Sequence, residues 1–245
     1  MNRLAGKVAL ITSDEHGLAA AVAAAFGREG AIVVIADANQ DRVQPIAAAV
    51  RKTGAECLAL AMDPSSPDSC EQAVLKIVDK YGRLDVLCNL AGEFPRTGPL
   101  HEIQEAEFDR AVAANIKSVL LVSRFAVPAI RESDGKGSII NLSHTAALNG
   151  VPGTSLLAAT KGALLNMTRD MALQGQREGF RVNCICVGST YVPVVPSLME
   201  EHHQHPVPAR ELMGSFVYLA SDESAHVNGH ILMVDDGMHA WRARH

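Results

Sequence analysis

Short apolar runs alternate with longer amphipathic stretches along almost the whole chain. The runs are rich in valine, isoleucine and leucine, and they lack the strict alternation of polar and apolar residues seen in half-buried strands. They predict strands at Val8–Thr12, Ile32–Ala36, Glu56–Ala61, Val86–Asn89, Ser138–Leu142, Arg181–Cys186 and His230–Val234. Such composition is typical of strands that are covered on both faces of a sheet.

The stretches between these runs carry apolar residues at helical spacing. They predict helices at His16–Glu29, Gln40–Lys52, Pro67–Lys80, Glu105–Arg131, Leu156–Glu178 and Arg210–Ala220. Repeated alternation of strand and helix favours parallel strands joined by right-handed crossovers. We therefore expect an α/β fold: a Rossmann-like, doubly wound, seven-stranded parallel sheet with helices on both faces, in one domain spanning residues 1–245.

One segment, residues 192–209, departs from this alternation because it is rich in proline and histidine. It is predicted to be a flap-like loop over a cleft, since clefts in open parallel sheets lie beyond the carboxyl ends of the strands. Glu200, Glu201, His202, His203 and His205 could bind a metal ion, but their spacing matches no zinc motif. We expect a solvated loop and no metal site.

Composition excludes several classes of protein. The chain has 245 residues, 48% of them hydrophobic, which suffices for one large core, and its formal net charge of −5 disfavours nucleic acid as a partner. No apolar run approaches the ~18 residues needed to span a bilayer, and the first residues lack the apolar stretch of a secretory signal. The five cysteines include no CxxC pair, so buried thiols are expected. These features predict a cytoplasmic protein without a membrane partner.

Several motifs occur in a fixed order along the chain. They are Thr12-Ser13-Asp14-Glu15-His16-Gly17-Leu18-Ala19, Asn89-Leu90-Ala91-Gly92, Ala114-Asn115-Ile116-Lys117, Ile139-Ile140-Asn141-Leu142-Ser143, Ala159-Thr160-Lys161-Gly162-Ala163, and the segments Leu219–Glu223 and Val234–Gly237. In this order and spacing they resemble the short-chain dehydrogenase/reductase family, whose corresponding patterns include TGxxxGxG, NNAG and YxASKxA. The resemblance covers nearly the whole chain and implies a dinucleotide-binding fold.

The resemblance also implies a set of catalytic positions, and this chain departs from it there. In the family, a tyrosine exchanges a proton with the substrate oxygen, and a lysine four residues later lowers the pKa of that tyrosine and holds the nicotinamide ribose. Lys161 and the helix asparagine Asn115 match the family. The tyrosine position is Leu157, the serine position is His144, and Ser143 lies one residue early, where a strand points its side chain to the opposite face.

Two side chains could replace the lost chemistry. His144 could act as a general acid–base because imidazole titrates near neutral pH, or it could simply fill the vacated space. Tyr191 could reach the cleft from the loop, or it could pack elsewhere. Without a tyrosine partner, the Lys161 ammonium is expected to extend to solvent or to pair with a carboxylate.

The phosphate-binding turn is altered as well. Gly17 remains, but Ser13 replaces the first family glycine, and Asp14 with Glu15 adds two carboxylates facing the expected pyrophosphate. Each close pair of like charges costs about 1 kcal/mol in water at ~4 Å. Alternatively, Asp14 caps the following helix and Glu15 favours its dipole.

Other nucleotide-binding positions are kept or weakened. The resemblance assigns Asp37 to the adenosine ribose, which favours NAD, and Asp63 to the adenine. The chain also keeps the family residues Asn89 and Gly92. The positions expected to contact the nicotinamide differ from the family. Val187 and Val192 stand where the family has proline and threonine, and Glu93 adds a negative charge. We therefore expect no tightly bound cofactor.

Taken together, these features indicate an inactive subunit. The family builds its dimers from the two long helices that correspond to Glu105–Arg131 and Leu156–Glu178, and both keep their amphipathic pattern. We expect a hetero-oligomer, a tetramer, with an active sibling of the same family that oxidises hydroxyacyl-CoA thioesters or alcohols with NAD, as in the benzylsuccinyl-CoA route. The alternatives are an active NAD-dependent oxidoreductase using His144 or Tyr191, and a non-catalytic metabolite-binding protein.

Overall fold

The computed structural model describes residues 2–13, 17–132, 134–188 and 209–237. Its centre is a seven-stranded sheet with the order β3-β2-β1-β4-β5-β6-β7, and every pair of neighbouring strands is parallel. The strands are β1 (Val8–Thr12), β2 (Ile32–Asp37), β3 (Cys57–Ala61), β4 (Val86–Asn89), β5 (Gly137–His144), β6 (Phe180–Val187) and β7 (Ile231–Val234). The predicted sheet is confirmed, and β5 and β6 are longer than their apolar runs indicated.

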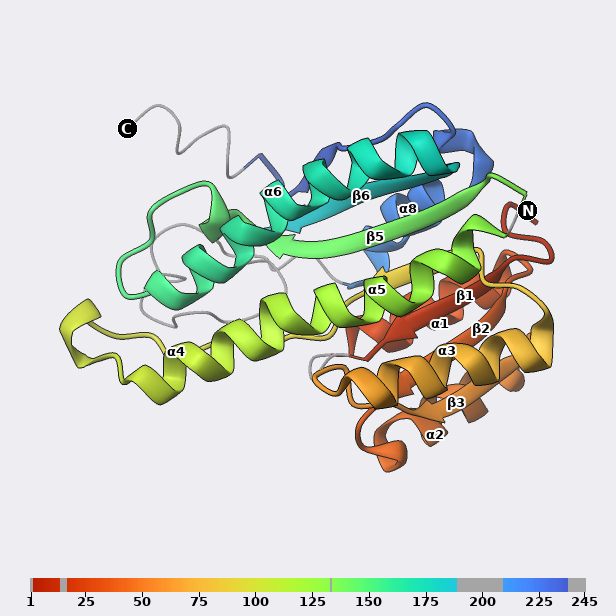
Figure 1. Cartoon of the computed structure of the whole chain (residues 1–245), viewed down its shortest axis with the longest axis horizontal. Coiled ribbons are helices and arrows are strands. Elements are labelled where there is room, and N and C mark those ends of the chain that lie inside the picture. The colour runs from red at the N-terminus through yellow and green to blue at the C-terminus, as the bar shows by residue number, and fades with distance from the viewer. Residues whose placement is uncertain (1, 14–16, 133, 189–208, 238–245) are drawn as a thin grey trace.

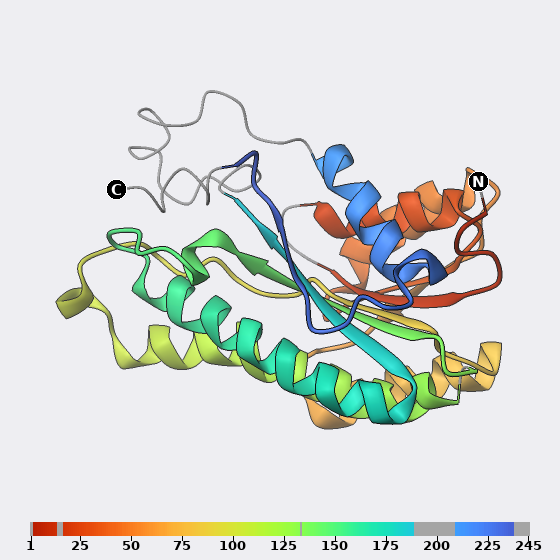
Figure 2. The same ribbon diagram turned by 90° about the horizontal axis from the view of Figure 1, so that it is seen from above.

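Helices cover both faces of this sheet (Figures 1 and 2). One face carries α1 (Leu18–Arg28), α2 (Gln40–Arg51) and α8 (Ala209–Ala220), and the other carries α3 (Pro67–Tyr81), α4 (Glu105–Val112), α5 (Ser118–Arg131) and α6 (Ser155–Glu178). Four short helical turns complete the described elements: η1 (Leu100–Glu102), η2 (Ala113–Lys117), η3 (Thr145–Ala147) and η4 (Asp222–Ser224). The predicted flap lies outside the described residues except for Ala209, which begins α8.

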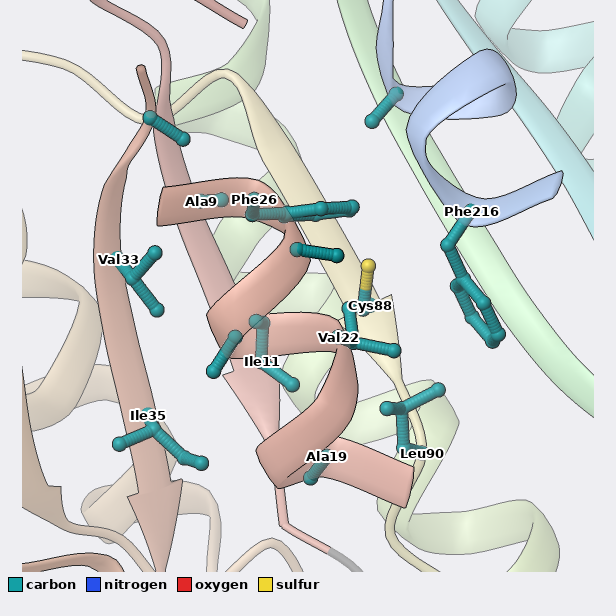
Figure 3. Close-up of a cluster of buried hydrophobic side chains, with 14 of the residues drawn as sticks. Ala9, Ile11, Ala19, Val22, Phe26, Val33, Ile35, Cys88, Leu90 and Phe216 are labelled. Carbon is teal, nitrogen blue, oxygen red and sulfur yellow. The ribbon is translucent and has the colours of Figure 1, made fainter. Parts of the chain in front are cut away.

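Both faces of the sheet are buried, which explains why its strands are continuous apolar runs in the sequence. Every residue of β1 is buried, and Figure 3 shows Ile11 of β1, Ile35 of β2 and Val22 and Phe26 of α1 as members of one buried cluster. Phe216 of α8 extends the same cluster. A strand packed this way needs hydrocarbon at successive positions, because both of its faces are inside the protein.

The long helix predicted from Glu105 to Arg131 is continuous but not uniform. Its middle turn, η2, is a π-helix that contains Asn115, and α4 and α5 flank it. The 27-residue stretch is apolar and long enough to span a membrane by composition, yet 44% of the tested window is buried against the rest of the fold. It is a layer of the domain, and α6 lies beside it.

The strand order creates a topological switch point at the carboxyl ends of the strands. β1 lies between β2 and β4, so the chain leaves β1 toward one side of the sheet and β4 toward the other. Ligands of open α/β sheets bind at such a switch point, beyond the carboxyl ends of the strands. The described residues that follow β1, β4 and β5 lie at these carboxyl ends.

Candidate functional site

Hydrogen bonds from a β1 threonine fix the start of the β4 loop. The Oγ1 atom of Thr12 accepts from the backbone amides of Leu90 at 2.9 Å and Ala91 at 2.8 Å. These are the residues that follow Asn89 in the family-like motif. Thr12, the first residue of the altered phosphate-binding motif, therefore holds the loop after β4 in place. The sequence did not reveal this structural function.

Asn89 belongs to a buried polar network rather than to an open binding surface. Its Nδ2 donates to Asn141 Oδ1 of β5 at 2.9 Å and to Ser123 Oγ of α5 at 3.2 Å. Asn141 in turn donates to Thr168 of α6 at 3.0 Å. The network connects two strands to the two long helices, so retention of Asn89 has a structural explanation.

Asn115 is satisfied in the same way. From the π turn, its Oδ1 accepts from the Glu93 amide at 3.0 Å, and its Nδ2 donates to the Glu93 carbonyl at 3.0 Å and to Thr160 Oγ1 at 3.2 Å. The side chain is completely buried. It thereby holds the loop after β4 against α6, and Thr160 is a partner that sequence analysis missed although it adjoins the lysine motif.

Gly92 lies where Asn115 and Lys161 converge. A Cβ atom at this position would stand 2.5 Å from Asn115 Oδ1 and 3.3 Å from Lys161 Nζ. The first distance is too short for any real side chain, so the position requires glycine. This brings three of the predicted remnants together in one place.

Lys161 has an unusual environment for a cation. The residue is 4% exposed, and within the described part of the chain its Nζ donates one hydrogen bond, to the Leu142 carbonyl at 3.4 Å. Desolvation by burial lowers the pKa of this amine to about 8, with the neighbouring Cys184 and Cys186 thiols opposing the shift. The expectation that Lys161 extends to solvent or pairs with a carboxylate is wrong for the described residues, because α6 packs the amine against the end of β5.

The catalytic tyrosine position is filled by hydrocarbon. Leu157 precedes Lys161 by about one turn of α6 and is 2% exposed. The chain has only three tyrosines: Tyr81 ends α3, Tyr218 belongs to α8 on the opposite face of the sheet, and Tyr191 lies outside the described residues. The described structure therefore places no phenol at the Leu157 position.

His144 and Ser143 end β5 and are both buried. Ser143 Oγ donates to the backbone carbonyl of Lys161 at 2.9 Å, so it joins the strand to α6. His144 Nδ1 accepts from the Ala146 amide at 3.0 Å, and the ring stands edge-on to Phe94 with centroids 6.1 Å apart. Because Nδ1 accepts, a neutral imidazole carries its proton on Nε2. Ser143 is thus hydrogen-bonded to the backbone of α6.

The nucleotide-binding positions are partly described. Gly17 is the N-cap residue of α1 and has a φ of +83°, a backbone conformation that a residue with a side chain seldom adopts. The acidic residues Asp14 and Glu15 lie outside the described residues, and so does the expected capping by Asp14. Ser13 donates its amide to the Ala36 carbonyl at 2.7 Å and thereby continues the pairing of β1 with β2.

The two aspartates at the ends of β2 and β3 have local hydrogen-bond partners. Asp37 Oδ1 accepts from the Asn39 amide at 2.7 Å, and Arg42 Nη1 stands 4.0 Å from the other oxygen. Asp63 Oδ1 accepts from Ser65 at 2.8 Å and 2.7 Å, which forms a turn before α3. Asp37 thus stands at the end of β2, where the family resemblance places a contact with the adenosine ribose.

The remaining candidate functional groups are the cysteines and the possible metal ligands. All five cysteines are buried free thiols, as expected, and burial raises the pKa values of Cys57 and Cys70 to about 11. Within the described ranges, no group of three histidine, cysteine or acidic residues is placed to hold a metal ion. The histidine segment from His202 to His205 lies outside those ranges.

Comparison with known proteins agrees with the fold. A family model described as enoyl-(acyl carrier protein) reductase matches residues 12–239. The chain is 34% identical to 2,5-dichloro-2,5-cyclohexadiene-1,4-diol dehydrogenase of Sphingobium indicum, over 96% of this chain and 97% of the relative. It is 31% identical to meso-2,3-butanediol dehydrogenase of Serratia marcescens, over 96% and 95%.

Solved structures agree as well. Levodione reductase superposes with a TM-score of 0.90 at 26% identity, covering 97% of this chain and 99% of that one. A short chain dehydrogenase from Mycobacterium smegmatis superposes with a TM-score of 0.86 at 27% identity, covering 96% and 93%. With its parallel sheet, its edge motifs and these full-length matches, the chain belongs to the short-chain dehydrogenase/reductase family.

Proposed function

We propose that this chain is a catalytically inactive subunit of a hetero-oligomeric dehydrogenase. The observation that carries the proposal is Leu157, a buried hydrocarbon at the position where the family transfers a proton. Leucine cannot donate, accept or ionise, and the neighbouring remnants Asn115, Asn89 and Ser143 all have structural hydrogen-bond partners. The scaffold explains their retention without catalysis.

The proposed partner is an active sibling of the same family that carries the tyrosine and binds NAD. Apolar side chains on the long-helix layer support such an assembly, since Phe108 of α4 is 47% exposed, Leu120 of α5 is 55% exposed and Leu173 of α6 is 65% exposed. An intact partner would be stabilised by mass action on binding this chain. The proposed substrates of the assembly are hydroxyacyl-CoA thioesters or alcohols, and this chain is proposed to hold no nucleotide tightly.

The experiment compares the chain alone with the chain co-expressed with an intact sibling from the same organism. The purified chain should transfer no hydride between NAD(H) and alcohols, ketones or 3-hydroxyacyl-CoA thioesters, whereas the pair should co-purify and be active. Hydride transfer by the chain alone would contradict the proposal. Loss of that activity in His144→Ala or Tyr191→Phe would instead support the atypical oxidoreductase.

Ligand binding distinguishes a non-catalytic metabolite-binding protein from an inactive subunit and from an atypical oxidoreductase. A stable homo-oligomer that binds a metabolite, but neither a sibling nor NADH, would favour a non-catalytic binding protein. Native mass spectrometry of the chain with and without the sibling measures assembly directly, independently of activity. A chain that never forms mixed oligomers would exclude the subunit proposal.

A further inference from the structure

A cavity of about 910 Å³ lies at the amino-terminal edge of the sheet. It is lined by the residues just before β5, by the second half of α6, by the start of β6 and by the segment between η4 and β7. The family resemblance places the catalytic residues at the other end of the strands, where His144 ends β5 and Gly92 follows β4. The cavity is therefore separate from the site that the family uses.

Positive charge dominates the lining of this cavity. Among the described residues that line it, the cations are Lys136, Arg169 and Arg181, and the carboxylate is Asp222. Asp222 is already paired twice, with Lys136 Nζ at 3.3 Å and with Nζ of Lys7, outside the lining, at 2.8 Å. A cleft lined by charge of one sign focuses the electric field and concentrates ions of the opposite sign. In a chain whose formal net charge is −5, this cluster of cations is suited to an anion.

The Arg181 guanidinium is a buried cation with an incomplete set of partners. The residue is 9% exposed, and its Nη2 donates to the carbonyls of Leu219 at 3.1 Å and Ser221 at 3.2 Å, at the end of α8. Its Nη1 is buried and has no hydrogen-bond partner among the described residues. Burial lowers the pKa of Arg181, and the charge of Asp222 opposes the shift, but a guanidinium remains charged at neutral pH. Capping of α8 accounts for Nη2, yet it leaves a costly buried charge without an anion in contact.

Arg169 is placed to contact a ligand directly. It is an exposed residue of α6, and its Nη1 donates to Asn166 Oδ1 at 2.8 Å, which leaves the guanidinium without a carboxylate among the described residues. The planar fork of a guanidinium matches two oxygens of a phosphate group. Arg169 and Lys136 therefore supply the contacts, and the buried Arg181 supplies charge that salt screens poorly.

We infer that this cavity binds a phosphate monoester of a small organic molecule. A phosphate monoester is close to a dianion at neutral pH and carries three acceptor oxygens, which suit several cations around one cavity. The volume exceeds what a phosphate ion alone would fill, because cavities of about 300–1,000 Å³ hold drug-sized ligands. Leu173, which is 65% exposed and lines the same cavity, offers hydrocarbon to the organic part.

The experiment locates a probe ligand, phenyl phosphate, on the full chain at low salt and about pH 8, where the phosphate is a dianion. In protein labelled with ¹⁵N-glycine, the amide signals of Gly135 and Gly229, which line the cavity, should shift and saturate. Those of Gly17 and Gly92, at the family's nucleotide-binding positions, should not move. Calorimetric titration should give a Kd at least about tenfold lower than for inorganic phosphate, because the phenyl group buries apolar surface, and phenol should not bind.

Three variants at exposed positions test the charges and the space separately. Arg169→Gln should raise the Kd for phenyl phosphate about fivefold, as expected for loss of an exposed ionic contact. Arg177→Gln removes the same charge from α6 outside the lining and should change the Kd less than about twofold. Ala225→Phe fills the cavity without changing its charge and should abolish binding. Circular dichroism checks that each variant is folded.

Several results would overturn the inference. Shifts at Gly17 and Gly92 instead of Gly135 and Gly229 would place the ligand at the other end of the strands. Equal losses in Arg169→Gln and Arg177→Gln, or unchanged binding in folded Ala225→Phe, would show that the cavity does not hold the probe. Inorganic phosphate binding as tightly as phenyl phosphate would exclude a site for an ester. Hydride transfer is not measured here, so the inactive-subunit proposal is tested independently.

Discussion

Asn115 pairs with both backbone polar groups of Glu93, accepting from its amide and donating to its carbonyl, each at 3.0 Å. The Asn115 side chain thus makes the same two hydrogen bonds with Glu93 that a paired backbone segment would make, and it joins the π turn to the loop that follows β4. It also donates to Thr160, which joins the same loop to α6. This position is occupied by asparagine for a reason that does not require catalysis.

Replacing this asparagine should be costly to stability. Asn115→Ala leaves the Glu93 amide and carbonyl without their partner in a buried setting, so we expect a loss of about 2–4 kcal/mol in the free energy of unfolding. Urea denaturation followed by circular dichroism measures it. Asn166→Ala, at an exposed position of α6, should change stability by less than about 0.5 kcal/mol. Equal effects of the two substitutions would show that the Asn115 hydrogen bonds contribute little.

Gly92 should tolerate no side chain. Gly92→Ala places a methyl group 2.5 Å from Asn115 Oδ1, and we expect a destabilisation of about 1–3 kcal/mol as the loop and Asn115 move apart. Gly150→Ala is the matched control, because a Cβ there meets no atom within 4 Å. Thermal unfolding should give a lower Tm for the first variant only. A normal Tm for Gly92→Ala would mean that the loop shifts without cost.

Removing the Lys161 charge should change the pH dependence of stability. The folded pKa of about 8 lies below the usual 10.5, so the unfolded chain holds more protons between these pH values, and the wild type gains stability as pH rises through this window. The gain is on the order of 3 kcal/mol when complete. Lys161→Met lacks this gain. The unfolding free energy of the variant minus that of the wild type should therefore fall from pH 8 to pH 10.

Urea denaturation of both proteins between pH 7 and pH 10 tests this directly. Comparing the two proteins cancels the opposite effect of the buried thiols, whose raised pKa values make the wild type lose stability at alkaline pH. A difference that does not vary with pH would show that Lys161 has the same pKa in both states.

The acidic residues of the altered turn should weaken nucleotide binding through charge. Asp14→Asn with Glu15→Gln removes two carboxylates from the segment that faces the pyrophosphate in the family. Each close contact costs about 1 kcal/mol, so NADH should bind about thirtyfold more tightly at low salt. Fluorescence titration measures the Kd. Asp109→Asn, an exposed carboxylate of α4, is the control and should change nothing. An unchanged Kd in the double variant would assign weak binding to Ser13 or to the nicotinamide end.

The sequence by itself determined the fold, because strands buried on both faces require continuous hydrocarbon, and helices between them require a periodic apolar face. The absence of a tyrosine four residues before Lys161 was equally visible, since the family motif depends on spacing within one helix. The π turn at Asn115 was not visible, because a π-helix adds one residue to a turn without a distinct pattern of residue types.

Only the tertiary structure decided what the retained polar residues do. Several of these residues have partners on strands, helices or loops that are distant in sequence, and sequence separation hides such pairs. They are Thr12, Ser123, Thr160 and Thr168. The same packing buries Lys161, which was expected to extend to solvent or to pair with a carboxylate. Its environment comes from β5, β6 and the loop after β4 closing around one end of α6, and burial by distant segments cannot be read from the residues adjacent to the lysine in the chain.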